Sequence, residues 1–248
     1  MINNYPLTNI YEKPSKNSKL SSQMLYGEKF KIISKKKGWI KIKTNFDKYC
    51  GYVSEKKFLK SLKTTKKVNK IKTKIYRKIK NKFKSTKQFL YFASKVSIIN
   101  RFKDYIEYDK NRWIKVNALK NINYYEKNFT KIIRLFLNTR YLWGGKSSAG
   151  IDCSALIQLY FYYNDIFFHR DTKDQIKFLK KNSKKKKYDK NCLIFWKGHV
   201  AYCLNKRYLI HAYGPKKKVL IMNIKKTIEE IKYKSKLTIR DIIKINVN

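Results

Sequence analysis

Short apolar runs alternate with polar and turn residues through the first half of the chain, and this period-two pattern predicts β-strands rather than helices. The pattern occurs twice. The segments QMLYGEKFKII and GWIKIK, within Tyr11–Lys43, correspond to QFLYFASKVSII and RWIKV, within Tyr76–Val116. Trp39 and Trp113 occupy equivalent places in the two copies. An internal repeat of this kind indicates two successive domains of the same architecture.

At roughly sixty residues apiece, the two copies predict two small β-barrels. We place the first barrel at residues 1–62 and the second at 72–122, with the lysine-rich segment Thr64–Lys74 as the linker between them. Residues 123–248 then form a third domain, and Asn121–Asn128 leads into its first helix.

The hydrophobic period changes at Cys153. Apolar and aromatic residues then recur at spacings of three and four, as expected of a largely buried helix: Leu156, Ile157, Leu159, Tyr160 and Tyr163. Gly144, Gly145 and Gly150 make the preceding segment a loop, and Asp152 is a suitable N-cap. The sequence therefore predicts a helix that begins at Cys153 behind a glycine-rich approach.

A cysteine at a helix start has the surroundings of a nucleophile. Unpaired backbone N–H groups and the positive end of the helix dipole favour the thiolate of Cys153 and supply donors for a developing oxyanion. A buried structural cysteine is the commoner fate of a free cysteine, and this segment alone leaves both interpretations open.

A nucleophilic cysteine needs a base, and the chain has three histidines: His169, His199 and His211. The last two lie on strands predicted to pair around a short turn. With the turn centred on Asn205, they are equally far from it and should face each other. His199 would then accept the proton of Cys153 while His211 orients its ring. Either histidine alone is more typical of a core residue.

Several segments carry a family resemblance: YLWGG at 141–145, DCS at 152–154, RDT at 170–172 with Gln175, LIFWKGHVAYCL at 193–204 and LIHAYG at 209–214. Together they resemble the NlpC-type (NlpC/p60) peptidoglycan peptidases, a papain-like family of cysteine endopeptidases, and most closely its dipeptidyl-peptidase VI branch. The resemblance implies an α+β fold, in which a helix bearing the cysteine packs on an antiparallel sheet behind bacterial SH3-like β-barrels.

The resemblance also implies an activity. Enzymes of this branch cut the bond between γ-D-glutamate and the diamino acid, meso-diaminopimelate or L-Lys, in cell-wall stem peptides, and they prefer a free N-terminal L-Ala. Cys153 corresponds to the nucleophile, His199 to the base and His211 to the orienting residue. The implied partner is a peptide derived from peptidoglycan, and the resemblance implies no cofactor.

The same resemblance implies a substrate site. Asp152, Ser154 and Thr172 match positions that hold the L-Ala-γ-D-Glu portion, while Tyr141 and Trp143 match aromatic walls of the pocket. An aspartate near the free amine makes electrostatic sense, because it pairs with an ammonium group and rejects blocked peptides.

Two features depart from the family pattern. Ala155 replaces the usual glycine after DCS, and Asn191-Cys192 replaces the usual Gly-Asp pair before the LIFW strand. Neither change removes a catalytic group, so they put the rate in doubt rather than the mechanism. In the first barrel, Glu28 and Tyr52 are weak candidates for substrate contact, and surface or packing roles are favoured for both.

The chain has 61 Lys and Arg against 16 Asp and Glu, a formal net charge of +45. Basic residues interleaved with aromatics, as in KIYRKIKNKFKSTKQFLYF, are the expected footprint of nucleic-acid binding. The lysines are however spread through every predicted domain and accompany abundant Ile, Asn and Tyr, as an AT-rich genome would impose. We therefore expect no specific nucleic acid partner, only non-specific attraction of anionic polymers and acidic peptides. The lysine run 180–187 is interpreted as a solvated loop.

No apolar run approaches the roughly 18 residues of a membrane span, and the N-terminal segment lacks the apolar core of a secretory signal. Four cysteines without a C-x-x-C pair do not resemble a disulfide framework. We therefore expect a cytoplasmic protein that processes imported wall peptides, with export by an unusual route left open. The oligomeric state is also left open.

Cys192, His199, Cys203 and His211 are zinc-type ligands within a short stretch. They lie along predicted paired strands, whereas zinc modules pair their ligands about two to five residues apart on turns, so we expect no metal site. Two alternatives to the peptidase remain: a non-catalytic protein that binds wall peptides, and a basic nucleic-acid-associated protein. The presence of Cys153 together with both histidines favours the enzyme.

Overall fold

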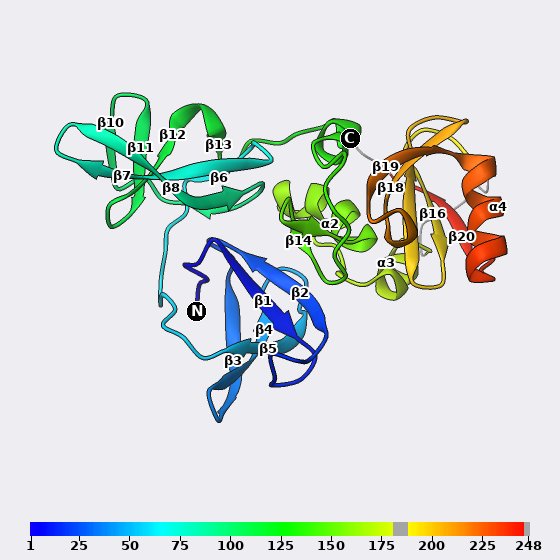
Figure 1. Ribbon diagram of the computed structural model, residues 1–248, viewed down its shortest axis with the longest axis horizontal. Coiled ribbons are helices and arrows are strands. Elements are labelled where there is room, and N and C mark those ends of the chain that lie inside the picture. The colour runs from blue at the N-terminus through cyan, green and yellow to red at the C-terminus, as the bar shows by residue number, and fades with distance from the viewer. Residues whose placement is uncertain (181–187, 246–248) are drawn as a thin grey trace. The chain divides into compact units, whose positions relative to one another are not determined.

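The computed structural model describes residues 1–180 and 188–245 (Figure 1). The chain divides into two compact units. Unit 1 contains Met1–Tyr124 together with Lys146–Ser148, and unit 2 contains Tyr125–Gly145 and Ala149–Asn248.

The first strands of unit 1 form a five-stranded antiparallel sheet in the order β2-β1-β5-β4-β3. They are β1 (Leu7–Tyr11), β2 (Leu20–Leu25), β3 (Phe30–Lys36), β4 (Trp39–Thr44) and β5 (Cys50–Ser54). Burial alternates along β4, where Ile40 and Ile42 lie in the core and Lys41 and Lys43 lie on the other face. The alternating pattern of this region therefore corresponds to short β-strands, as predicted.

A second group of strands in unit 1 forms a five-stranded sheet, β10-β11-β12-β7-β8, and a three-stranded sheet, β13-β6-β9. The elements are β6 (Lys66–Val68), β7 (Lys72–Ile79), β8 (Lys82–Tyr91), β9 (Lys95–Val96), β10 (Asn100–Phe102), β11 (Tyr105–Asp109), β12 (Arg112–Lys115), a 3-10 helix (Val116–Ala118) and β13 (Leu119–Asn121). Their shared core includes Ile75, Leu90, Ile106 and Ile114. The two copies of the sequence repeat therefore form separate sheets within unit 1.

The linker prediction for Thr64–Lys74 was wrong. Residues Lys66–Val68 form β6, which pairs with β9 and β13, and β7 already begins at Lys72. Val68 is fully buried in the core of the second β domain. The strand has only three residues, two of them lysines, so its alternation of polar and apolar positions is too short to be recognised in the sequence.

Strand β14 (Lys146–Ser147) belongs to unit 1, where Lys146 is buried with Glu28. The Lys146 ammonium lies 3.1 and 3.2 Å from the two carboxylate oxygens of Glu28, and the Lys146 backbone N–H donates to Gln23 Oε1 at 2.8 Å. Burial raises the pKa of Glu28, and the nearby ammonium opposes that shift. Glu28 therefore serves packing and an ion pair inside unit 1, which is the role favoured from the sequence.

Unit 2 is built on a five-stranded antiparallel sheet in the order β19-β18-β17-β16-β20. The strands of this sheet are β16 (Cys192–Trp196), β17 (His199–Cys203), β18 (Tyr208–Tyr213), β19 (Lys218–Asn223) and β20 (Asp241–Lys244). A further strand of unit 2, β15 (Gly150–Ile151), lies outside the sheet. The helices of unit 2 are α1 (Phe129–Arg134), α2 (Cys153–Tyr163), α3 (Thr172–Lys180), a 3-10 helix (Gly214–Lys216) and α4 (Ile224–Ser235). Beyond Lys180, the lysine run predicted as a loop lies outside the described residues.

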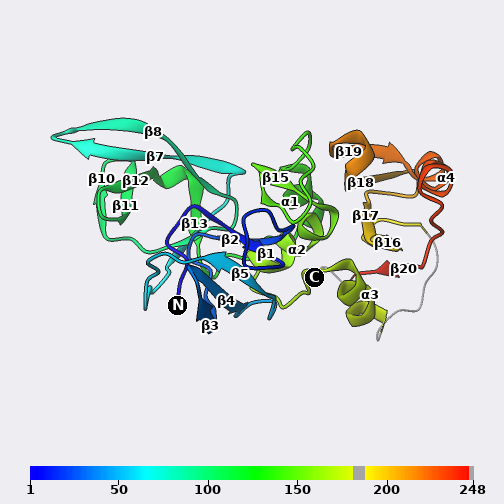
Figure 2. The ribbon, with the colours of Figure 1, turned by 60° about the horizontal axis from the view of Figure 1, so that its bottom comes forward.

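Helices cover both faces of this sheet. Figure 2 shows α1 and α2 on one side and α4 on the other. All residues of α2 are buried, and the ring of Phe129 in α1 lies 4.3 Å from Tyr160 of α2 and 4.6 Å from Tyr202 of β17. On the opposite face, Ile224 and Ile231 of α4 join the sheet residues in one core. A cysteine-bearing helix on an antiparallel sheet confirms the predicted α+β class.

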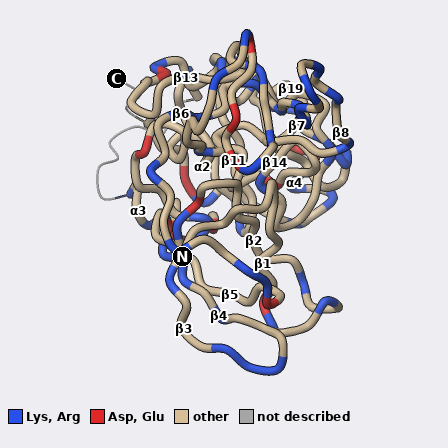
Figure 3. The backbone as a smooth tube through the Cα atoms, turned by 90° about the vertical axis from the view of Figure 1, so that its left-hand side faces the viewer, with Lys and Arg blue, Asp and Glu red and all other residues tan. Residues whose placement is uncertain are grey.

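Lys and Arg positions are spread along the chain in both units, with few Asp and Glu between them (Figure 3). This distribution agrees with dispersed basic residues rather than one basic motif. Within the described ranges, no helix has the length and apolar character needed to cross a bilayer.

Candidate active site

Helix α2 begins at Cys153, as predicted, because Asp152 caps it. The Asp152 backbone is extended (φ −100°, ψ 175°), and its Oδ1 accepts the N–H of Ala155 at 2.8 Å. The loop before α2 requires glycine at position 145, because a Cβ there would lie 2.4 Å from the carbonyl oxygen of Gly150. The tight loop and the cap together fix the position of the sulfur.

Cys153 faces the start of β17. Its Sγ lies 3.9 Å from the carbonyl oxygen of Gly198, and the residue is 4% exposed. Gly198 has a φ of +73° in the two-residue turn between β16 and β17, where glycine adopts the left-handed region without strain. This turn makes His199 the first residue of β17, so the helix start and the turn bring the nucleophile and the first histidine to one place.

Burial raises the pKa of the Cys153 thiol to about 12, and the negative charge of Asp152 contributes to the rise. Backbone N–H groups of Val200 and Ser154 and the guanidinium of Arg170 oppose this shift of the pKa but do not cancel it. Our prediction that the helix start favours a resting thiolate was therefore wrong. Burial beside an anionic N-cap outweighs the helix dipole, and Cys153 is a thiol at neutral pH.

His199 and His211 form a hydrogen-bonded pair, with Nε2 of His199 2.9 Å from Nδ1 of His211. The ring of Tyr213 stacks on His211 at 4.7 Å, and Trp196 lies 5.5 Å from His199. Burial lowers the pKa of His199 to about 4. Burial, with a contribution from His199, lowers the pKa of His211 well below its ordinary value. Both rings are neutral at pH 7, which a base that accepts a proton requires.

The two histidines are diagonal neighbours on paired strands rather than directly opposed. β17 and β18 pair Cys203 with Leu209, so the hairpin is centred on Lys206. The prediction placed the centre of the hairpin at Asn205, one residue too early. An error of one residue in the centre changes the predicted partner of each residue by two positions. Side chains two residues apart on a strand share a face, so the pair still meets.

The neutral thiol and imidazole predict a specific pH dependence. We expect kcat/KM to fall on the acid side with an apparent pKa clearly below 6.5, because His199, whose pKa is about 4, must be unprotonated to accept the thiol proton. Unfolded histidines titrate near 6.5, so the unfolded state binds more protons between 6.5 and 4 and folding stability also declines in that window. Rates and unfolding curves measured at each pH separate the two effects. An acid limb at or above 6.5 would contradict a neutral pair of histidines.

A buried ion pair, to which the sequence had assigned no role, holds the carboxylate of Asp152. Arg170 donates to Oδ1 through Nη1 at 3.0 Å and to Oδ2 through Nη2 at 2.7 Å. The Gly144 N–H donates to Oδ2 at 2.9 Å and the Ser154 hydroxyl to Oδ1 at 3.1 Å. Together with the N–H of Ala155, these donors surround the carboxylate, so an ammonium group of a substrate would compete with them for Asp152. The RDT segment contained the signal, since Arg170 is its first residue.

Ser154 and Thr172 lie at the starts of two neighbouring helices. The Ser154 hydroxyl accepts from Arg170 Nη1 at 2.7 Å, and its backbone carbonyl accepts from Gln175 Nε2 at 3.0 Å. Gln175 thereby ties α3, which begins at the half-buried Thr172, to the start of α2. The third histidine, His169, packs its ring against Phe167 and Phe178.

Tyr141 and Trp143, the predicted aromatic walls, have different surroundings. Burial raises the pKa of Tyr141, and the charges of Cys153 and Asp152 add to the rise, so Tyr141 lies beside the nucleophile. Trp143 is 58% exposed. The described structure thus brings Tyr141, Asp152, Cys153 and Ser154 together and leaves the Trp143 ring open to solvent.

Comparisons with known proteins agree with these observations. Residues 138–237, which contain Cys153 and both histidines of the pair, match the NlpC/P60 family. The chain carries an NlpC/P60 peptidase domain. Residues 10–58 match the bacterial dipeptidyl-peptidase SH3 domain, so the predicted order of an SH3-like domain before an NlpC/P60 domain is confirmed.

Individual proteins are similar to most of the chain. Dipeptidyl-peptidase 6 of Lysinibacillus sphaericus is 25% identical over 230 residues, which cover 83% of this chain and 84% of the relative. The fold is similar to the crystal structure of an NlpC/P60 family protein from Bacillus cereus ATCC 10987, with a TM-score of 0.79, 17% identity and coverage of 100% and 99% of the two chains. An NlpC/P60 endopeptidase from Photobacterium damselae subsp. piscicida has a TM-score of 0.57 and 15% identity, with coverage of 95% and 69%. NlpC/P60 peptidases are cysteine hydrolases, which confirms the predicted class of enzyme.

The departures of this NlpC/P60 domain from the family pattern are accommodated by packing. Ala155 is fully buried in the first turn of α2. Cys192 is also buried, in the core between the sheet and α4. Asn191 has a φ of +67°, and its Oδ1 accepts the hydroxyl of Tyr202 at 2.6 Å.

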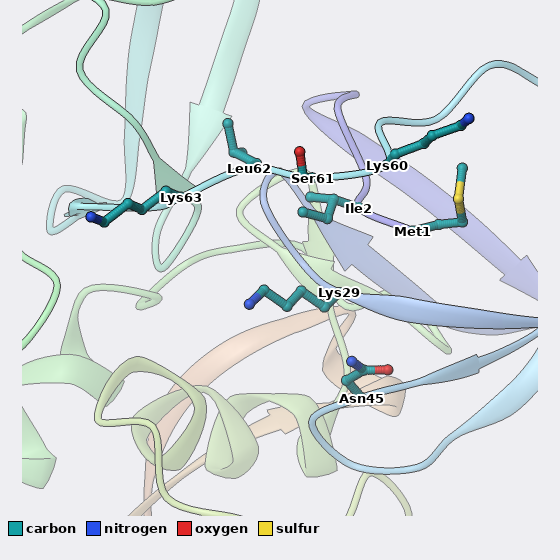
Figure 4. Close-up of a pocket in the computed structure, with 8 residues that line it drawn as sticks. All are labelled: Met1, Ile2, Lys29, Asn45, Lys60, Ser61, Leu62 and Lys63. Atoms are coloured by element: carbon teal, nitrogen blue, oxygen red, sulfur yellow. The ribbon is translucent and has the colours of Figure 1, made fainter.

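Unit 1 contains a cavity of about 540 Å³, which lies outside the NlpC/P60 domain. It is lined by Met1, Ile2, Lys29, Asn45, Lys60, Ser61, Leu62 and Lys63 (Figure 4). The Lys60 ammonium points away from those of Lys29 and Lys63, so the basic side chains do not converge on one anion. Among the residues that the structure describes, no group of three or more His, Cys, Asp or Glu side chains is arranged to hold a metal ion.

Proposed function

We propose that the protein is a cysteine endopeptidase that hydrolyses the bond between γ-D-glutamate and meso-diaminopimelate or L-Lys in wall stem peptides with a free N-terminal L-Ala. The observation that carries this proposal is Cys153 at the start of α2, facing the strand that begins with His199 of the hydrogen-bonded pair. This arrangement supports covalent catalysis by a thiol with a neutral imidazole as its base.

In the first step, Cys153 Sγ attacks the scissile carbonyl carbon while its proton passes to Nδ1 of His199, the nitrogen that the bond to His211 leaves available. The backbone N–H groups of Cys153 and Ser154 have no acceptor within α2 and stabilise the oxyanion, whereas the N–H of Ala155 is already bonded to Asp152. His199 then gives the proton to the leaving amine, and the carbon–nitrogen bond breaks to leave a thioester. A water molecule, deprotonated by His199, hydrolyses the thioester, and the proton returns to Sγ.

Three features support a short acidic wall peptide as the substrate. The chain is similar over most of its length to a relative named dipeptidyl-peptidase 6. Tyr141 and Ser154 beside the thiol and the exposed Trp143 provide both polar and aromatic contacts for a dipeptide end. The formal charge of +45 attracts acidic peptides, and a γ-linked D-Glu keeps a free α-carboxylate.

We further propose that the enzyme acts on imported fragments during recycling of the wall, inside the cell. The cysteines support this assignment, because Cys50 is free and exposed while Cys153, the proposed nucleophile, is buried. A reducing compartment keeps an exposed thiol and a catalytic thiol from oxidation.

The proposal is tested with pure, reduced protein and two synthetic peptides, L-Ala-γ-D-Glu-meso-diaminopimelate and its N-acetylated form. We expect release of L-Ala-D-Glu from the free peptide and about 100-fold slower turnover of the acetylated one, because acetylation removes the ammonium charge that Asp152 attracts. A second pair with L-Lys in the third position identifies the preferred diamino acid. Mass spectrometry of the products measures all four rates.

Two results would count against the proposal. Failure to hydrolyse any of the peptides would favour a non-catalytic protein that binds wall peptides. Equal rates on free and acetylated peptides would leave an NlpC/P60 hydrolase without the requirement for a free N-terminal amine.

A further inference from the structure

Met222 contacts the second histidine of the catalytic pair. Its Sδ lies 3.3 Å from Nε2 of His211, while the other ring nitrogen of His211 is bonded to His199. The contact follows from the register of β18 and β19, which sets His211 opposite Leu220 and puts Met222 two residues further along the same face. The thioether and the two imidazoles therefore form a continuous row.

The members of this row differ in what they can donate. A thioether sulfur has no proton and only accepts a hydrogen bond, whereas each neutral imidazole has one N–H and one lone pair. When Nε2 of His211 carries the proton, it donates to Met222, and Nδ1 of His211 accepts the Nε2–H of His199. His199 then has its lone pair at Nδ1, where the proton of Cys153 must go.

The opposite arrangement of protons is unproductive. With the proton of His211 on Nδ1, its Nε2 lone pair would face the lone pairs of the Met222 sulfur. His211 is 0% exposed, so bulk water does not relieve this mismatch. His199 would accept at Nε2 and carry its own proton on Nδ1, where it could no longer receive one from Cys153.

We propose that Met222 is a positioning residue that holds both histidines in the tautomer needed to accept the proton of Cys153. The inference rests on the cysteine-peptidase function proposed above and adds a fourth residue to its proton path. Met222 performs this role without charge. A carboxylate in its place would favour the protonated form of His211, whereas a thioether leaves both histidines neutral. The stacked ring of Tyr213 also adds no formal charge at neutral pH.

The test uses the full chain, labelled with ¹⁵N-histidine, and the variant Met222→Leu, which nearly conserves volume and removes the acceptor. Long-range ¹H–¹⁵N spectra at pH 7 report which ring nitrogen carries each proton. We expect Nε2–H on both His199 and His211 in the wild type, and a mixture with Nδ1–H in Met222→Leu.

The kinetic expectation is a fall in kcat of about tenfold with KM unchanged, which is part of the roughly 10²- to 10⁴-fold that a general base contributes. Met24→Leu is the matched control, because it makes the same chemical change at a buried methionine of unit 1. This control should alter neither the tautomers nor kcat.

A folded Met222→Leu protein with wild-type tautomers, or with shifted tautomers and wild-type kcat, would overturn the inference. If the variant does not fold, the wild-type spectrum decides alone, since Nδ1–H on His211 contradicts the proposed role. The spectra need no substrate. Loss of the proposed peptidase function would appear as an inactive wild type, and it is therefore distinguishable from failure of the Met222 assignment.

Discussion

Replacement of Cys153 by alanine is expected to abolish peptide hydrolysis, with a loss of at least about 10⁴-fold in kcat, while the protein stays folded. No other described group can form the thioester at the start of α2, and the histidine pair has no proton to accept once the sulfur is gone. Small, apolar alanine is compatible with the buried first turn of the helix. The measurement is release of L-Ala-D-Glu from the free tripeptide, with thermal unfolding recorded in parallel.

Cys50→Ala is the matched control for this variant. Cys50 is a free, exposed cysteine in unit 1, so its loss should leave the rate within about twofold of wild type. Residual activity of Cys153→Ala above one tenth of the wild-type rate would show that another group is the nucleophile. A fall of the same size in Cys50→Ala would show that hydrolysis depends on thiols in general.

The second large effect is expected from breaking the buried ion pair between Arg170 and Asp152, next to Cys153. Arg170→Met is expected to lower the free energy of unfolding of unit 2 by about 3–5 kcal/mol, because it leaves the buried carboxylate of Asp152 without its cation. The uncompensated charge lies next to Cys153 and raises the pKa of its thiol further, so kcat should also fall. Denaturant unfolding followed by tryptophan fluorescence, together with the peptide assay, measures both effects.

Lys234→Met provides the control for Arg170→Met within the same unit. Lys234 pairs with Glu230 at 3.0 Å on the exposed side of α4, and such pairs contribute at most about 1 kcal/mol. If Arg170→Met costs no more than Lys234→Met, the carboxylate of Asp152 must be satisfied by its backbone and hydroxyl donors alone.

Local patterns were sufficient to predict the main elements of the active site. Asp152 followed by Cys153 and an apolar helical period predicted where α2 begins, because the N-cap and the period both lie within one short window. The apolar strands around a polar turn predicted the hairpin that carries His199 and His211. The family of the C-terminal domain followed from the same segments, and comparison with known proteins confirmed it.

Features that depend on pairs of distant positions could not be predicted in the same way. The hairpin register depends on one residue of turn geometry, and the turn between Cys203 and Leu209 carries no glycine to fix its centre. The resting state of Cys153 depends on how deeply α2 is buried, which requires the sheet to be in place. The contact of Met222 with His211 appears only when β19 is registered against β18.

The ion pair of Lys146 and Glu28 limits how this protein can be divided. The sequence passes out of unit 2 for the three residues Lys146–Ser148 and returns shortly before the nucleophile, so no single cut separates the units. A fragment that ends at Tyr124 keeps the buried carboxylate of Glu28 but loses the ammonium that neutralises it. Truncations and domain exchanges must therefore keep both partners together, or replace both at once with uncharged residues.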